Sequence, residues 1–175
     1  MNLFKKTLYV SSTAILLASL FACTMEATND PQHTDEAASA IADFDLPAGY
    51  SAEFSTSMLG YSVAAYKGPN GPSHLYLIQS EKKSDGDELT NMLAQLVPGA
   101  GNPDTRMTVS ENRTATLRGQ EATLIVSEGV NSENISYRQA SIAFEGKGGP
   151  ALILFSESVE AWHQPAFDEF LASIH

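Results

Sequence analysis

The feature that most constrains the fold is a succession of short segments in which apolar and polar residues alternate, each followed by turn-forming residues. Such alternation is typical of strands with one buried face. Glycine and proline clusters at 68–72 and 146–150, and the pair Arg118-Gly119, are predicted turns between strands. Strands joined by short turns pair antiparallel, because parallel neighbours need a long crossover connection. The sequence therefore predicts an antiparallel sheet.

The predicted strands fall in two groups separated by a helix. The first group lies at residues 50–54, 59–65 and 75–79. The second group contains a short strand at Met107 and Val109, a segment at Ala115 and Leu117 that leads into the turn, and segments at 122–126, 135–144 and 152–155. The last segment is an unbroken apolar run, which is typical of a central strand buried on both faces.

Two amphipathic helices are predicted beside the sheet. In each, four apolar residues recur at helical spacing and form one face: Leu89, Met92, Leu93 and Leu96 in the first, Phe167, Phe170, Leu171 and Ile174 in the second. Ser84 or Asp85 can cap the first helix, and Trp162 precedes the second as a packing anchor. We therefore predict the α+β class, with a single antiparallel sheet of about seven strands covered by two amphipathic helices.

Composition excludes some partners and bonds. The formal net charge is −11, and no basic patch is present, so nucleic acid is not an expected partner because its phosphates would repel the chain. Cys23 is the single cysteine, so one chain cannot form an internal disulfide. The apolar core must hold the fold, and hydrophobic residues make up 43% of the chain.

The first residues have the pattern of an export signal. Lys5 and Lys6 precede an uncharged apolar run from Leu8 to Phe21, which is too short to span a bilayer. The run ends in Leu20-Phe21-Ala22-Cys23, which resembles the lipobox of bacterial lipoproteins. The resemblance implies removal of residues 1–22 and lipid on Cys23, with acyl chains enough for stable membrane anchoring. Thr24 is not aspartate, so the same resemblance favours the outer membrane, facing the periplasm.

The remaining chain divides at a change in pattern near residue 44. Residues 24–43 are small, polar and acidic, and they show no periodic apolar face before Ile41. We expect residues 23–43 to be a lipidated N-terminus and flexible tether, with a short helix possible at Ala37–Ala42. We expect residues 44–175 to form the globular domain.

The globular part resembles the PsbP-type α/β/α sandwich domains, which also occur in bacterial lipoproteins. It begins with Pro47-Ala48-Gly49-Tyr50, has Gly119 before a predicted strand, and ends in a helix closed by Ser173-Ile174. The resemblance implies a sheet covered by helices. It implies no activity, since that family shares none and a fold does not determine a function.

Residues that could carry chemistry are scattered. The histidines, His33, His74, His163 and His175, match no metal motif, and the only thiol is assigned to lipid. The acidic run 84–88 lacks the ligand spacing of a calcium loop and suits helix capping. Gly146–Gly149 lacks the features of a phosphate loop. We therefore predict no catalytic residue, no metal ligand, no cofactor and no enzymatic activity.

These observations favour a membrane-anchored envelope lipoprotein that acts as a non-catalytic protein-binding or assembly module. The expected partners are the membrane, through lipid on Cys23, and an envelope protein. The candidate binding loops are 68–72, 98–106 and 146–150. Two alternatives remain at this point: a module that binds a small ligand or lipid, and an enzyme whose site has no sequence motif.

Overall fold

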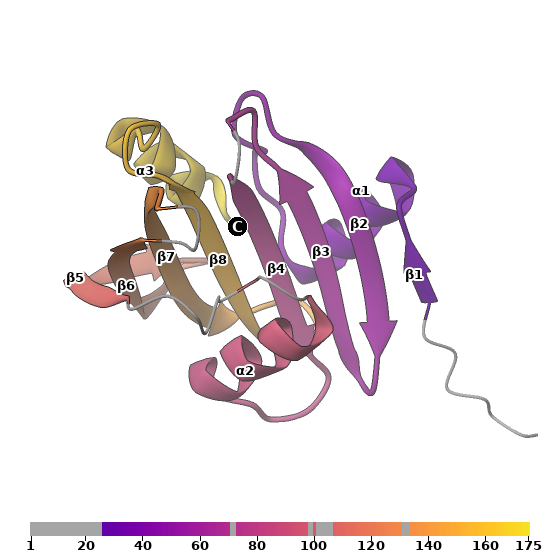
Figure 1. Ribbon diagram of the computed structural model, residues 1–175. Helices are drawn as coiled ribbons and strands as arrows, with labels where there is room; N and C mark the ends of the chain where they lie inside the picture. The colour runs from indigo at the N-terminus through magenta and orange to yellow at the C-terminus, as the bar shows by residue number, and fades with distance from the viewer. Residues whose placement is uncertain (1–25, 71–72, 98–99, 101–106, 131–133) are drawn as a thin grey trace, which may run out of the picture.

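The computed structural model describes residues 26–70, 73–97, 100, 107–130 and 134–175. In chain order they form β1 (Glu26–Thr28), α1 (Pro31–Ile41), β2 (Ser51–Met58), β3 (Tyr61–Lys67), β4 (His74–Ser80), α2 (Gly86–Leu96), β5 (Thr108–Leu117), β6 (Gln120–Val130), β7 (Ser136–Glu145), β8 (Pro150–Ser158) and α3 (Gln164–Ser173) (Figure 1). The eight described strands make one antiparallel sheet in the order β1-β2-β3-β4-β8-β7-β6-β5. The predicted α+β class is confirmed. Strand β1 adds to the predicted elements, and α1 is longer than the short helix expected at Ala37–Ala42.

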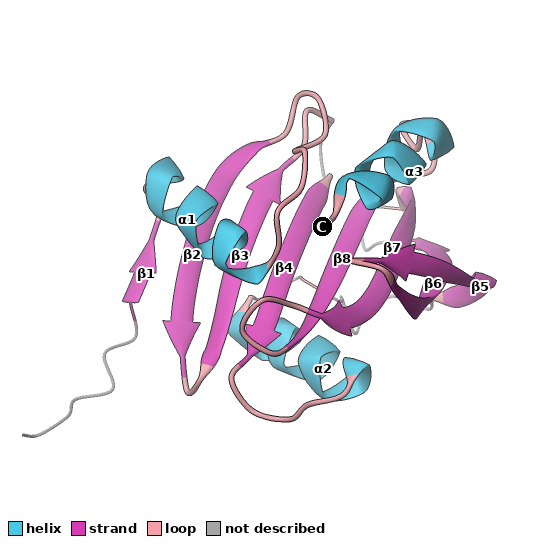
Figure 2. Cartoon of the chain, turned by 180° about the vertical axis from the view of Figure 1, so that it is seen from behind, coloured by secondary structure: helices cyan, strands magenta, loops and turns pink. Residues whose placement is uncertain are grey.

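The helices cover the sheet on both faces. In Figure 2, α1 and α3 lie in front of the sheet and α2 lies behind it. Strand β4 shows the division, because Leu75 and Leu77 belong to the core under α1 and α3, whereas Tyr76 and Ile78 belong to the core under α2. All four are at most 7% exposed. A strand buried on both faces reads as an apolar run, and β8 at the centre of the sheet fits this rule as well.

The two predicted helices take the predicted positions. Asp85 caps α2 by accepting a hydrogen bond from the backbone N–H of Glu88 at 2.9 Å. The apolar stripe of α3 is buried at Phe167, Phe170 and Leu171. Trp162 contacts the rings of Phe155 and Phe167, so its predicted role as a packing anchor is confirmed. Each helix therefore seals one part of the sheet with the residues that its periodicity indicated.

The expected flexible tether requires correction from residue 26 onward. Strand β1 pairs with β2, and α1 begins at Pro31 after the capping residue Asp30. The buried side of α1 consists of Thr34, Ala38 and Ile41, at i, i+4 and i+7. Two of these three residues are small, so the helical face lacks the large apolar residues by which such faces are recognised. Residues 26–43 are part of the fold.

The end of α1 is fixed from two sides. The backbone N–H of Lys147 donates to the carbonyl of Ile41 at 2.8 Å. Asp43 and His175 exchange backbone hydrogen bonds of 3.2 and 3.0 Å, so the C-terminus lies beside the segment that follows α1. The predicted signal peptide 1–22 and the predicted lipidation residue Cys23 lie outside the described residues.

Candidate functional site

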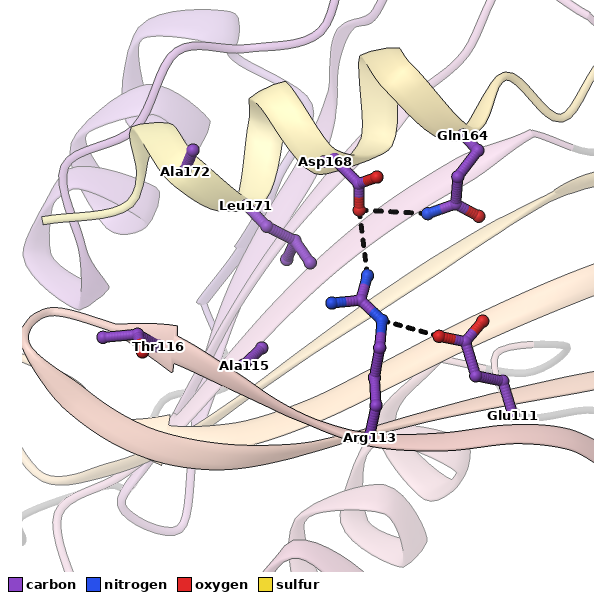
Figure 3. Close-up of a pocket in the computed structure, with 8 residues that line it drawn as sticks. All are labelled: Glu111, Arg113, Ala115, Thr116, Gln164, Asp168, Leu171 and Ala172. Atoms are coloured by element: carbon purple, nitrogen blue, oxygen red, sulfur yellow. Dashed lines mark hydrogen bonds and ion pairs between the residues drawn. The ribbon is translucent and has the colours of Figure 1, made fainter.

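An open groove lies between the edge strand β5 and the helix α3. Its volume is about 530 Å³, and Figure 3 shows the eight residues that line it: Glu111, Arg113, Ala115 and Thr116 from β5, and Gln164, Asp168, Leu171 and Ala172 from α3. Five of the eight carry polar or charged side chains. The groove joins the last strand of the sheet to the last helix of the chain.

The register of β5 aims its charged residues at α3. Arg113 lies opposite Leu124 of β6, and Glu111 lies opposite Val126. Both β6 partners are buried in the core under α1 and α3, so this face of β5 points to the same side. Residues two apart on a strand share a face. A β-bulge between Val109 and Glu111 interrupts the register with β6 just before Glu111.

Arg113 is the centre of the groove. Its Nε donates to Oε1 of Glu111 at 2.6 Å, and its Nη2 donates to Oδ1 of Asp168 at 2.9 Å (Figure 3). Gln164 donates to the same Asp168 oxygen at 3.0 Å. The charged side chains of Arg113, Glu111 and Asp168 are 39%, 42% and 50% exposed. At this exposure solvent screens the ion pairs, so they orient β5 against α3 more than they stabilise the fold.

The polar groups continue along the start of α3. Trp162 Nε1 donates to Oε1 of Gln164 at 3.0 Å, which links the groove to the aromatic core. The guanidinium of Arg138 lies 5.2 Å from the centre of the Trp162 ring, close enough for a cation–π contact. Arg138 also pairs with Glu128 on the neighbouring strand. The groove thus borders a row of charged residues that crosses β6 and β7.

A second polar cluster is buried at the end of β8. Glu157 is 8% exposed, and Ser73 is completely buried. The hydroxyl of Ser73 lies 2.7 Å from the carbonyl oxygen of Asn70 and 3.4 Å from Oε1 of Glu157. Burial raises the pKa of Glu157, although hydrogen bonds from Ser73 and Asn70 oppose the rise. Burial likewise raises the pKa of Tyr50, whose hydroxyl faces this cluster.

This buried cluster does not assemble a hydrolase site in the described residues. A serine nucleophile needs a base within hydrogen-bond reach. The charge of His163 acts to lower the pKa of Glu157. The Nδ1 atom of His163 accepts a hydrogen bond from the backbone N–H of Ala166 at 3.2 Å and so caps α3. That nitrogen is thereby occupied, and no contact joins His163 to Ser73 among the described residues. The cluster is best explained as a buried polar contact between the loop before β4 and the end of β8. The buried hydroxyl of Tyr50 beside it has no hydrogen-bond partner among the described residues.

The other histidines are dispersed. His33 lies 3.3 Å from Asp30 on the exposed side of α1. His74 stacks on Tyr76 with the ring centres 5.4 Å apart and lies 3.5 Å from Glu53. Within the described part of the chain, no three side chains of histidine, cysteine, aspartate or glutamate gather as a metal site would require.

The 146–150 turn, one of the candidate binding loops, does not line the groove. Gly148 of the 146–150 turn donates its backbone N–H to Oε1 of Gln79 at 2.9 Å, and Lys147 donates its Nζ to the carbonyl of Ser39 at 2.9 Å. This turn therefore connects β4 to α1 through hydrogen bonds. Residues 71–72, 98–99 and 101–106 of the other two candidate loops lie outside the described residues.

Sequence reasoning missed the groove residues. The available signal was the spacing Glu111-x-Arg113, which places opposite charges on one face of a strand. Both residues lie between the predicted segments at 107–109 and 115–117, which the structure joins into one strand. Asp168 is 55 residues away in sequence from Arg113, and no local pattern connects them. Only the packing of α3 beside β5 brings the three together.

Comparisons with known proteins find similarity among solved structures. No protein-family model matches the chain, and no curated protein matches it. Among solved structures, the chain is similar to the solution structure of the cyanobacterial PsbP (CyanoP) from Synechocystis, with 13% sequence identity, coverage of 95% of this chain and 98% of that chain, and a TM-score of 0.45. A likeness at this level assigns neither a site nor an activity to the chain.

Proposed function

We propose that this chain is a membrane-anchored bacterial envelope lipoprotein whose domain binds an envelope protein without catalysis. The lipobox-like sequence ending at Cys23 supports the anchor. The described helices are all too short to span a bilayer. The groove between β5 and α3 is the observation that carries the binding role.

The groove suits an extended protein segment. Strand β5 ends the sheet order, so one side of its backbone has no neighbouring strand in the described structure. A partner strand can add to such an edge through main-chain hydrogen bonds, while pockets beside the edge select its side chains. The row of Glu111, Arg113 and Asp168 supplies that selection by charge.

The groove fits the two alternative functions less well. Sites for small apolar ligands are concave and mostly apolar, and they enclose most of the ligand. This groove is open, and charged or polar residues supply five of its eight lining side chains. An enzyme needs a positioned nucleophile, base or metal. The lining groups that could act as a base are Glu111 and Asp168, and both are held in ion pairs with Arg113.

The anchor is tested with Cys23→Ser in the full chain. The variant lacks the thiol that receives lipid, so we expect it to leave the membrane fraction or to remain unprocessed. Mass spectrometry of the mature N-terminus reports lipidation directly. A native chain cleaved elsewhere and carrying no lipid would overturn the proposed anchor.

The binding surface is tested with a photo-crosslinking residue at Ala172, which is exposed and lines the groove. The matched control is Ala40, which is exposed near the end of α1. We expect the probe at Ala172, and not at Ala40, to capture one identified protein in native membranes. Capture only at Ala40 would place the binding surface on the opposite part of the fold. Capture at neither position, together with multiple turnover of a substrate by the purified chain, would replace binding by catalysis.

A further inference from the structure

Strand β5 leaves a long sheet edge with little protection. It has ten residues, whereas β1 at the opposite edge has three. Natural edge strands are commonly shielded by proline, lysine, short length or a bulge. Strand β5 contains no proline or lysine. Its protection consists of the charged residues Glu111 and Arg113 and of a bulge near its beginning, between Val109 and Glu111. The stretch from Glu111 to Leu117 is therefore regular and able to pair.

The turn after β5 sets which of its residues face outward. Arg118 and Gly119 have φ values of 50° and 75°, which make a two-residue hairpin turn of type I′ between Leu117 and Gln120. The residues that flank a turn share a hydrogen bond, and hydrogen-bonded pairs alternate along an antiparallel ladder. Counting back from Leu117, the backbone groups of Thr116, Thr114 and Asn112 point away from β6. Their side chains are exposed as well.

The charges of this edge are complementary to themselves. If two copies of β5 pair antiparallel about a twofold axis at Asn112, Glu111 of each copy lies directly opposite Arg113 of the other. Opposite charges in direct cross-strand positions are favourable, and like charges are not. A twofold axis at Arg113 would place arginine opposite arginine, and an axis at Thr114 would place Arg113 opposite Ala115. The charges therefore select Asn112 as the centre.

Arg113 has donors left for such a contact. Guanidinium has five N–H donors. Among the described residues, the hydrogen bonds to Glu111 and Asp168 use one on Nε and one on Nη2. The side chain is 39% exposed. A carboxylate from another chain can approach it along the open groove without displacing Asp168.

We propose that the protein partner of this groove is a second copy of the chain, paired through β5 about Asn112 into one continuous sheet. This inference rests on the proposed binding function. The two copies bring the two grooves together, and each Arg113 then lies between its own Asp168 and Glu111 and the partner copy's Glu111. In this register residues 111–113 of the two copies pair with each other, and Thr114 of each copy lies opposite Ser110 at the bulge of the other.

The test uses single cysteine substitutions in the full chain, expressed with its own signal in a bacterial envelope. Asn112 residues in a hydrogen-bonded cross-strand pair lie about 5.5 Å apart between Cα atoms, which suits a disulfide. We expect Asn112→Cys to give a disulfide-linked dimer as its major species on a non-reducing gel. Thr116→Cys is the matched control on the same strand face, because in this register the two copies lie roughly 27 Å apart at that position.

A charge exchange supplies a second measurement. Arg113→Glu places acidic residues opposite each other, so the dimer dissociation constant of the purified, detergent-solubilised chain should rise about tenfold or more. The double variant Glu111→Arg with Arg113→Glu restores opposite charges across the twofold axis, and it should regain most of the affinity. Analytical ultracentrifugation measures the constants, and thermal unfolding of each variant separates lost pairing from lost folding.

The outcomes distinguish the two proposals. A monomer at all concentrations with no disulfide at Asn112→Cys overturns pairing of two copies. A disulfide at Thr114→Cys instead overturns the assigned register. If the Ala172 probe still captures a different protein in either case, the binding function stands and only the identity of the partner is wrong. If the Ala172 probe captures nothing as well, the binding function fails with it.

Discussion

Phe155 is the aromatic residue around which the face under α1 and α3 packs. Its ring centre lies 5.5 Å from that of Tyr50, 5.3 Å from that of Phe167 and 6.1 Å from that of Phe170. Aromatic pairs at these separations contribute beyond the area that they bury. One residue of β8 thereby joins the segment before β2 to the terminal helix.

The first prediction concerns Phe170, which is 2% exposed in this cluster. Replacing it by alanine should lower the free energy of unfolding by about 3–5 kcal/mol, because a buried ring is lost and a cavity remains. Urea denaturation measures the change. Glu169→Ala, on the exposed side of the same helix, is the control. An unchanged midpoint for Phe170→Ala would place α3 outside the core.

The second prediction concerns the pH dependence of Glu157. Burial raises the pKa of this carboxyl, so the folded chain holds its proton more tightly than the unfolded chain does. Stability from the protonated form is full below the unfolded pKa of about 4.3 and is lost as the pH rises through the folded value. Glu157→Gln keeps an acceptor for Ser73 and removes the charge. It should therefore raise the urea midpoint at pH 7.

The gain from Glu157→Gln should disappear below about pH 4, where both proteins are uncharged at this position. Urea midpoints of the two proteins at a series of pH values provide the measurement. Glu160→Gln, at an exposed position, is the matched control. The difference in stability between the native protein and Glu157→Gln should therefore change with pH. A constant difference across the series would contradict a raised pKa for the Glu157 carboxyl.

At the scale of elements, α1 is bound to the sheet by a narrow stripe. Its buried residues are Thr34, Ala38 and Ile41, and the carbonyl of Ile41 receives the backbone N–H of Lys147. Tyr66 of β3 donates its hydroxyl hydrogen to Asp35 at 3.0 Å, which adds a polar contact across the same interface. Contacts from β3 and the β7–β8 turn therefore hold α1.

The third prediction tests α1 as a part of the fold. The backbone amides of Ala38 and Ile41 should exchange with solvent deuterium slowly, at rates close to those of β3. Replacing Ile41 by alanine should cost about 2–5 kcal/mol, because the side chain is completely buried. Ala40→Gly, on the exposed side, separates helix propensity from burial and should cost about 1 kcal/mol. Exchange of both amides at the rate of an unstructured peptide would contradict this prediction and support the interpretation of this segment as a flexible tether.

The sequence predicted elements wherever large apolar residues marked the buried face. The stripes of α2 and α3 and the alternation in β4 are of this kind, because leucine, isoleucine and phenylalanine bury large areas and stand out from polar neighbours. Only the end of α1 was predicted, as a short helix at Ala37–Ala42, because threonine and alanine fill most of its interface. The groove was missed because the contact between Arg113 and Asp168 depends on where α3 packs.

At the scale of the whole molecule, the groove and the proposed attachment point lie at opposite edges of the sheet. Strand β1 is three residues after Cys23 in sequence, and β5 lies at the opposite end of the sheet (Figure 1). Seven spacings of about 4.8 Å separate them, which gives roughly 34 Å. The edge that continues toward the proposed lipid is thus far from the edge that carries the groove, and both can be occupied at once.

The fourth prediction concerns the connection between lipid and fold. The native chain on vesicles should resist release by protease, because Thr24 and Met25 alone separate Cys23 from β1 and leave little room for an enzyme. Insertion of a Gly/Ser segment with a protease site between Met25 and Glu26 should permit release of the intact domain. Sedimentation of the vesicles separates bound from released protein. Equal release from the native chain would show that β1 detaches readily.

The position of β1 also limits how the protein meets its partners. With lipid on Cys23, three residue steps of at most about 3.6 Å allow the domain to move no more than about 11 Å from its attachment point. Such a domain diffuses in two dimensions with the bilayer and meets mainly molecules in the same thin layer. Confinement of this kind raises the local concentration of neighbours, as linking does for tethered binding modules. An interface too weak to form in dilute solution can therefore be well populated on the membrane.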